Sequence, residues 1–88
     1  MFRLWGKIIH ENHLVKDYLY CEESEETRTH KIFNGLEKIC YEFDLEKPIW
    51  LDSNISEFNR VGKTRFRQDS FIEPIEFEYL EVHIIQED

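Results

Sequence analysis

Two stretches rich in β-branched and aromatic residues, FRLWGKIIH and LVKDYLYC, lie near the start of the chain and are separated only by ENH. Such runs with a short polar break between them predict a β-hairpin, with strands at residues 2–9 and 14–22. Asn12 tolerates a positive φ angle, so we expect Glu11 and Asn12 to form the turn. That turn fixes a register with one apolar face, in which the opposed pairs are Phe2 with Cys21, Leu4 with Leu19 and Ile8 with Val15.

The opposite face of the predicted hairpin is cationic and aromatic, with Arg3, Lys7 and Lys16 among its residues. We interpret its aromatic and apolar residues as a candidate interaction face, which consists of Trp5, Ile9, Leu14, Tyr18 and Tyr20. A single helix covers only one face of a sheet, so this second face needs another cover. We expect the cover to be the segment that contains Trp50 and Phe58, a partner protein, or a second copy of the chain in a homodimer.

The middle of the chain carries helical signals. Ser24 is followed by two glutamates, which is typical of a helix start. Apolar residues at helical spacing then predict one main helix over residues 24–44. Gly35 costs about 1 kcal/mol relative to alanine inside a helix, so we expect either a close packing contact or a bend at this position.

The second half of the chain is expected to hold a short helix and a long strand. Ser53 is expected to cap a helix at residues 53–60, which Gly62 ends. Residues 75–86 are apolar on both faces in their second half, which favours a central strand. The predicted fold class is α+β, an antiparallel or mixed sheet of three or four strands with one main helix packed on one face.

Composition limits the class of protein. With 88 residues and 41% hydrophobic content, the chain suits one domain, residues 1–88, with one core. No apolar run approaches the roughly 18 residues of a membrane span. Cys21 and Cys40 form no CxxC pair, and we expect both to be buried, reduced thiols in a cytoplasmic protein. The formal charge of -8 repels nucleic-acid backbones and anionic membranes, so neither is expected as a direct partner.

Four cations stand close together in the stretch FNRVGKTRFRQDSF, namely Arg60, Lys63, Arg65 and Arg67. One interpretation is a hairpin with residues 75–86, in which Arg65 faces Glu78, Arg67 faces Glu76 and Phe66 faces Phe77. Each charge pair would then contribute about 0.2 to 1 kcal/mol. The other interpretation is a site for an anion such as RNA, a phosphorylated ligand or an acidic partner, with Phe58, Phe66 and Phe71 available for stacking.

The remaining motifs are incomplete. Gly62-Lys63-Thr64 imitates the end of a phosphate-binding loop, but the glycine that this motif needs five residues earlier is Glu57. His10 and His13 in HENH have the spacing of metal ligands without a third or fourth partner. No motif gives any residue a catalytic role, so we expect a non-enzymatic protein with no cofactor and no metal.

The block TRFRQDSFIEPIEFEYLEV, together with the opening MFRLWGKII, resembles small uncharacterised bacterial proteins of similar length. The resemblance covers nearly the whole chain. It implies a compact stand-alone protein and transfers no activity and no site residue.

Three hypotheses of function follow from the sequence. The leading one is a small protein that acts through protein–protein contacts. The second is an acidic inhibitor that mimics nucleic acid and occupies the basic groove of a nucleic-acid-binding protein. The third is an anion-binding protein that uses the four cations of the basic block.

Overall fold

The computed structural model describes residues 1–87 and has four antiparallel strands in one sheet, in the order β2-β1-β4-β3. The strands are β1 (Phe2–His10), β2 (His13–Glu22), β3 (Lys63–Phe66) and β4 (Tyr79–Gln86). Two helices, α1 (Arg28–Glu42) and α2 (Asp52–Val61), lie between β2 and β3 in the chain, and a short 3₁₀ helix, η1 (Gln68–Ser70), follows β3. The predicted α+β class is confirmed.

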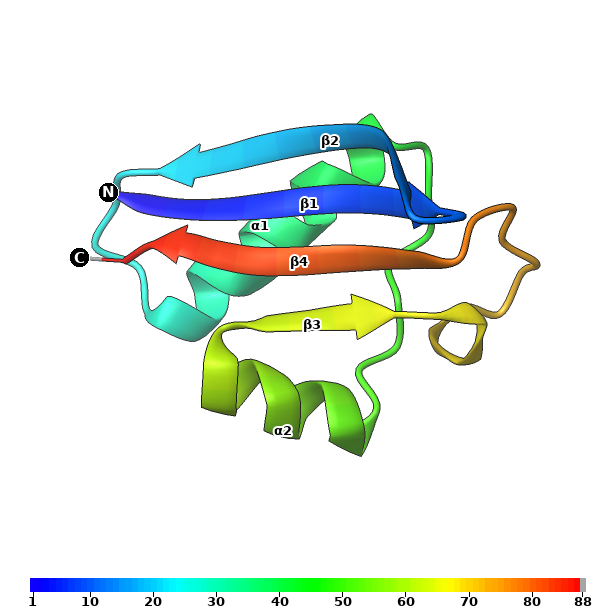
Figure 1. Cartoon of the computed structure of the whole chain (residues 1–88). Helices are drawn as coiled ribbons and strands as arrows, with labels where there is room; N and C mark the ends of the chain where they lie inside the picture. The colour runs from blue at the N-terminus through cyan, green and yellow to red at the C-terminus, as the bar shows by residue number, and fades with distance from the viewer. Residues whose placement is uncertain (88) are drawn as a thin grey trace.

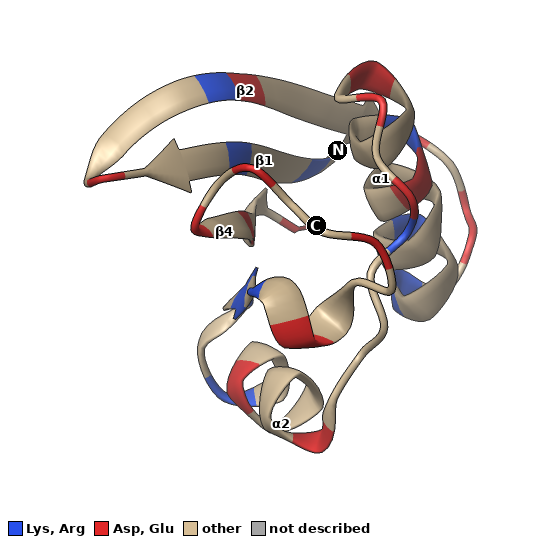
Figure 2. Cartoon of the chain, turned by 90° about the vertical axis from the view of Figure 1, so that its right-hand side faces the viewer, with Lys and Arg blue, Asp and Glu red and all other residues tan. Residues whose placement is uncertain are grey.

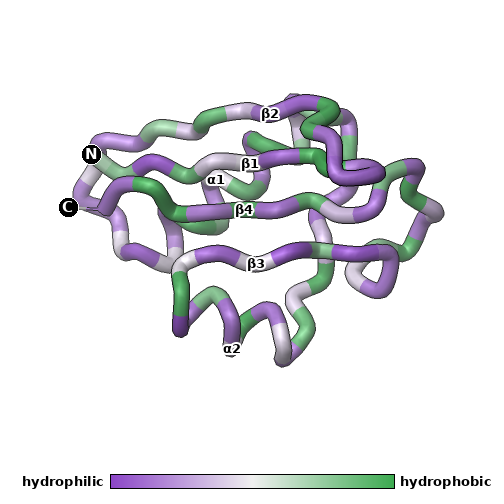
Figure 3. Tube along the Cα trace, in the orientation of Figure 1, coloured by the Kyte–Doolittle hydropathy of each residue, from purple (hydrophilic) through white to green (hydrophobic). Residues whose placement is uncertain are grey.

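The helices leave one face of the sheet bare. Helix α1 crosses behind the sheet in Figure 1, and α2 packs beside the edge strand β3. Alternate residues of each strand point toward the helices, and the alternation of hydropathy along β1 is visible in Figure 3. The buried side chains of this helix side include Leu4 and Ile8 of β1, Leu80 and Val82 of β4, and Phe66 of β3. They form the core with Ile39 and Leu36 of α1.

The hairpin forms as predicted, but its register shifts along the strands. Glu11 and Asn12 form the turn with positive φ angles of 50° and 64°, as a two-residue hairpin turn requires. Next to the turn, Ile9 lies opposite Leu14. A β-bulge then makes Val15 an extra residue, so Ile8 lies opposite Lys16 and Leu4 opposite Tyr20. The predicted register is therefore wrong beyond the bulge.

The bulge decides which β2 side chains are buried. Tyr18 lies opposite Gly6 and Tyr20 opposite Leu4, so both tyrosine rings turn toward α1. The residues between them in sequence turn the other way: Leu19 and Cys21 are exposed. The expectation of a buried Cys21 is thus wrong, while Cys40 is buried in the core as expected.

Glycines let α1 approach the sheet closely. A Cβ atom on Gly35 would lie 2.8 Å from Cδ2 of Leu4 and 2.9 Å from Cδ2 of Tyr20. Gly35 therefore serves a close packing contact, which was one of the two expected alternatives. On β1, a Cβ atom on Gly6 would lie 2.5 Å from Cγ2 of Ile39, whose side chain is fully buried.

Replacing Gly6 with alanine is expected to destabilise the protein by about 1 to 3 kcal/mol, because the buried Ile39 has no space to move away. Urea unfolding followed by tryptophan fluorescence measures this change in the free energy of unfolding. The matched background is Ile39→Ala, which removes the clashing atoms, so Gly6→Ala should cost much less there. Equal costs in both backgrounds would show that the close approach of α1 is not the cause.

The helix boundaries differ from the prediction at their N-terminal ends. Helix α1 begins at Arg28, because the side chain of Thr27 accepts a hydrogen bond from the backbone N–H of His30 (3.2 Å). The predicted cap, Ser24, instead donates a hydrogen bond to Glu22. Helix α2 begins at Asp52, one residue before the expected start, and Gly62 caps its C-terminal end as expected. The N-cap is Leu51 and not the predicted Ser53, and the backbone N–H of Leu51 donates to the side chain of Asn54.

The central position of the last strand is confirmed, since β4 pairs with β1 and with β3. The strand begins at Tyr79 and not at residue 75. No helix within residues 1–87 has the length and apolar character that a membrane span requires.

Candidate binding face

The face of the sheet opposite α1 carries no helix within the described residues, as the side view in Figure 2 shows. Register and alternation assign its side chains, and we call this surface the open face. Its members are Arg3, Trp5, Lys7 and Ile9 of β1, Leu14, Asp17, Leu19 and Cys21 of β2, Lys63 and Arg65 of β3, Tyr79, Glu81 and His83 of β4, and Arg67 just after β3.

Charge is segregated between the open face and the rest of the chain. The open face holds five of the eleven Lys and Arg residues but only two of the nineteen Asp and Glu residues. Both of these acids, Asp17 and Glu81, already bind side chains of the same face. The open face is therefore cationic in a protein of charge -8, and most acids lie on the helices and loops (Figure 2).

Glu81 is the centre of the open face. It is only 7% exposed, and its two oxygens bind Lys7 from β1 (Nζ to Oε1, 2.8 Å) and Arg65 from β3 (Nε to Oε2, 3.0 Å). Burial alone would raise the pKa of Glu81, but hydrogen bonds from Lys7 and Arg65 outweigh burial and hold the pKa below its ordinary value. One buried carboxylate thus joins the three strands β1, β4 and β3.

The aromatic rings of the open face are covered by cations. The ammonium group of Lys7 lies 4.2 Å from the ring centroid of Trp5. The guanidinium carbons of Arg65 and Arg67 lie 4.8 Å and 4.9 Å from the ring centroid of Tyr79. Stacking of this kind orders a guanidinium group while its N–H donors remain free to bind an anion. The guanidinium groups of both arginines therefore lie against the same tyrosine ring.

His83 lies on β4 directly opposite Trp5 of β1 and Lys63 of β3. Burial, followed by the nearby charges of Lys63 and Lys7, lowers the pKa of His83 below its ordinary value. The imidazole is consequently neutral near pH 7, and the cationic character of the open face comes from its lysines and arginines.

The predicted charge ladder between β3 and the last strand is wrong in register. Arg65 lies opposite Glu81 and Phe66 opposite Leu80, because residues 67–78 form η1 and a loop in place of a tight connection. Glu78 instead accepts a hydrogen bond from the backbone N–H of Glu11. Arg65 therefore does form a cross-strand ion pair with the last strand, but its partner is Glu81 in place of Glu78.

Three of the four predicted anion-binding residues lie together. Arg60, Arg65 and Arg67 line a groove of about 520 Å³ between α2 and the edge of β3, together with Glu57 and Asp69. Lys63 lies at the far end of β3, beside His83. The three phenylalanines expected to stack on a ligand are unavailable, because Phe58, Phe66 and Phe71 are all buried in the core. On the open face, the ring of Tyr79 stacks with Arg65 and Arg67 of the chain itself.

The predicted interaction face divides between the two sides of the sheet. Trp5, Ile9 and Leu14 belong to the open side, whereas Tyr18 and Tyr20 lie under α1. The segment with Trp50 and Phe58 does not cover the open face. Its Trp50 ring packs edge-on against Phe58 and Phe66 on the helix side, with centroids 5.4 Å and 5.0 Å apart.

The sequence analysis missed Lys7, Tyr79 and Glu81 as parts of one site. The available signal was the alternation of Tyr79, Glu81 and His83 within the predicted central strand, which places all three on one face. Their meeting with Lys7 depends on the β1–β4 pairing, which joins residues far apart in the chain.

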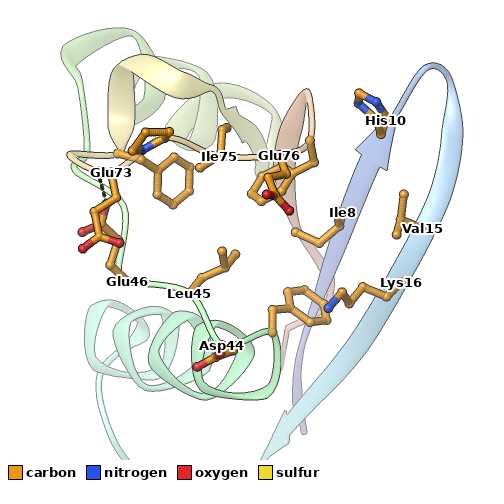
Figure 4. A pocket seen from close by; sticks show the side chains of 14 residues that line it. Ile8, His10, Val15, Lys16, Asp44, Leu45, Glu46, Glu73, Ile75 and Glu76 are labelled. Carbon is orange, nitrogen blue, oxygen red and sulfur yellow. Dashed lines mark hydrogen bonds between the residues drawn. The ribbon is translucent and has the colours of Figure 1, made fainter.

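A second concave site lies where the hairpin end, the C-terminus of α1 and the loop before β4 meet (Figure 4). This cavity of about 590 Å³ has apolar walls that include Ile8, Leu45 and Ile75. On its rim, Glu46 accepts hydrogen bonds from the backbone N–H groups of Ile72 (2.8 Å) and Glu73 (3.0 Å). That carboxylate is used to hold the loop against the chain after α1.

Comparison of the chain with protein-family models, with curated proteins and with solved structures gives no significant match.

Proposed function

We propose that this chain is a small non-enzymatic protein that acts through protein–protein contacts, and that its open face binds an acidic segment of a partner protein. The observation that supports this most is the charge segregation: five cations gather on a bare sheet face whose two carboxylates are already bound. Charge complementarity favours a partner that supplies carboxylates.

The aromatic contacts favour carboxylates over nucleobases as the ligand groups. A base would have to stack on Trp5 or Tyr79, and both rings already hold cations. A carboxylate can instead bind the outward N–H groups of Arg65 and Arg67 in the bidentate geometry that guanidinium favours. The proposal therefore retains the expectation that nucleic acid is not a direct partner.

The binding test uses a fluorescent peptide of about ten glutamates, with a glutamine peptide and a single-stranded DNA of equal length as comparisons. We expect the chain to bind the glutamate peptide and to lose at least about tenfold in affinity, roughly 1.4 kcal/mol, in the Lys63→Glu/Arg67→Glu variant. Neither residue has a carboxylate within ion-pair distance in residues 1–87, so the substitutions break no ion pair and remove only the exposed stacking of Arg67 on Tyr79.

The matched control is Lys47→Glu, since Lys47 is exposed on the helix side and makes only a long contact of 3.7 Å with Glu37. Its affinity for the glutamate peptide should equal that of the unchanged chain. Tighter binding of the DNA than of the glutamate peptide would contradict the proposal, and so would equal losses in the control and the double variant.

The proposal also includes the absence of catalysis and a cytoplasmic location. Burial raises the pKa of Cys40 to about 12, so this thiol is protonated near pH 7 and is a poor nucleophile. His10 and His13 face each other at the exposed hairpin turn. Cys21 and Cys40 are both free thiols, in keeping with a reducing compartment.

A further inference from the structure

We propose that β2 pairs edge to edge with β2 of a second copy of the chain, which joins two sheets into one antiparallel sheet of eight strands. This inference rests on the free edge of β2 and does not require the open face to bind anything.

The two edges of the sheet are treated differently by the fold. Strand β3 has four residues, carries Lys63 and Arg65, and has its Arg65 carbonyl bonded by Nδ2 of Asn54 (3.0 Å). These are ways in which proteins protect an edge from further pairing. Strand β2 has ten residues and no proline. Within residues 1–87, its backbone groups bond only to β1, so its outer row of N–H and C=O groups is unpaired.

The surface beside this edge is apolar and leaves room for another strand. Leu14, Val15 and Leu19 of β2 are 52%, 56% and 41% exposed. On the helix side, a groove of about 730 Å³ separates β2 from α1 and is bordered by Tyr18, Tyr20 and the exposed Tyr41. A second strand along β2 would cover Leu19 and this groove.

The charges of β2 identify a second copy as the occupant. A two-fold axis perpendicular to the sheet places one residue opposite itself and keeps equivalent faces together. With Leu19 on the axis, Leu19 meets Leu19, Tyr18 meets Tyr20, and Lys16 meets Glu22 twice. An axis at Lys16 or Asp17 sets like charges against each other, and an axis at Tyr18 leaves Lys16 opposite Tyr20. The Leu19 register thus pairs unlike charges along residues 16–22, where β2 is regular beyond its bulge.

The pairing can be tested by sedimentation velocity over a wide range of concentration. We expect a concentration-dependent dimer of the unchanged chain, and at least about tenfold weaker dimerisation in Leu19→Lys, which sets two like charges on the axis. The control is Val61→Lys, because Val61 is 44% exposed on α2, which packs beside β3 at the opposite edge of the sheet from β2. A strict monomer at high concentration would overturn the proposal, as would equal effects of the two lysine variants.

A mixing experiment tests the register. Lys16→Glu and Glu22→Lys should each weaken self-association by about tenfold, because each homodimer then contains two pairs of like charges. An equimolar mixture of the two variants should restore dimers, since each unlike pair is re-formed between different chains. Equal dimerisation of Lys16→Glu alone, of Glu22→Lys alone and of their mixture would refute this register. The two proposals can fail separately. A chain that dimerises but does not bind the glutamate peptide contradicts only the proposed function, and a chain that binds the peptide as a strict monomer contradicts only the pairing of β2.

Glu22 also accepts hydrogen bonds from Tyr20 (2.7 Å) and Asn34 (3.2 Å), so Glu22→Lys alters contacts within the chain. Circular dichroism melting of each variant determines whether it is folded. If Glu22→Lys does not fold, the comparison of Leu19→Lys with Val61→Lys still decides the proposal.

Discussion

Replacing Phe66 with alanine is expected to lower the free energy of unfolding by about 3 to 5 kcal/mol, because the ring is fully buried between the sheet and the helix layer. Phe66 pairs with Leu80 on the central strand and packs edge-on against Trp50, with centroids 5.0 Å apart. The substitution leaves a cavity that α2 and β3 cannot close without breaking their own contacts. Small domains have a total stability of about 5 to 15 kcal/mol, so a large part of it would be lost.

Urea unfolding at low temperature measures this loss. The matched control is Phe33→Ala, because Phe33 also packs edge-on against Trp50, with centroids 6.5 Å apart, but is half exposed. The control is expected to cost less than about 1 kcal/mol, since little apolar surface returns to water. Equal costs at the two positions would contradict the placement of Phe66 in the core.

Replacing Glu81 with glutamine is expected to have opposite effects on stability and on binding. The free energy of unfolding near pH 7 should fall by about 2 to 3 kcal/mol, since Lys7 and Arg65 both lose the buried carboxylate that pairs with them. This value is below that of a fully buried pair because the side chain of Arg65 is 49% exposed. Affinity for the glutamate peptide should rise, because Lys7 and Arg65 are no longer neutralised within the open face.

The pH dependence of the Glu81→Gln effect gives an independent measure. Because the folded-state pKa of Glu81 is lowered, its stabilising contribution is present above the ordinary carboxyl pKa, about 4.5, and is lost as the pH falls through the folded-state value. Urea unfolding of both proteins should therefore differ near neutral pH and converge in acid. Glu76→Gln is the control, since Glu76 is exposed and was the predicted partner of Arg67. A pH-independent difference between Glu81→Gln and the unchanged chain would contradict the ionic role of Glu81.

Local patterns predicted the elements well, and long-range pairing was predicted poorly. Asn12 and Gly62 have the φ angles that their residue types favour, so the hairpin turn and the end of α2 follow from sequence. The expected pairing of Arg65 with Glu78 failed because η1 lengthens the connection between β3 and β4. A change in the length of this connection shifts every residue pair between β3 and β4, and the sequence of neither strand shows how long the connection is.

In the candidate site, too, local features were predictable from the sequence and long-range pairing was not. The sequence has Lys63, Arg65 and Arg67 at alternate positions, and β3 presents Lys63 and Arg65 on one face of the sheet. It did not place Lys7 beside them, because Lys7 reaches Glu81 only through the β1–β4 pairing. It also assigned Tyr18 and Tyr20 to the wrong side, because the bulge at Val15 reverses the two faces of β2.

The sequence by itself determined the α+β class, the hairpin turn, the helix-ending role of Gly62 and the presence of a basic block in an acidic chain. These features depend on residue type, periodicity and the φ angles that each residue tolerates, all of which act within a few positions. The tertiary structure decided which face stays open and which carboxylate meets the arginines. The bulge turns Tyr18 and Tyr20 toward α1 and leaves Leu19 outside, in a packing where Gly6 and Gly35 allow the helix to approach the sheet closely. Such close packing depends on side chains from distant segments, so no local pattern could reveal it.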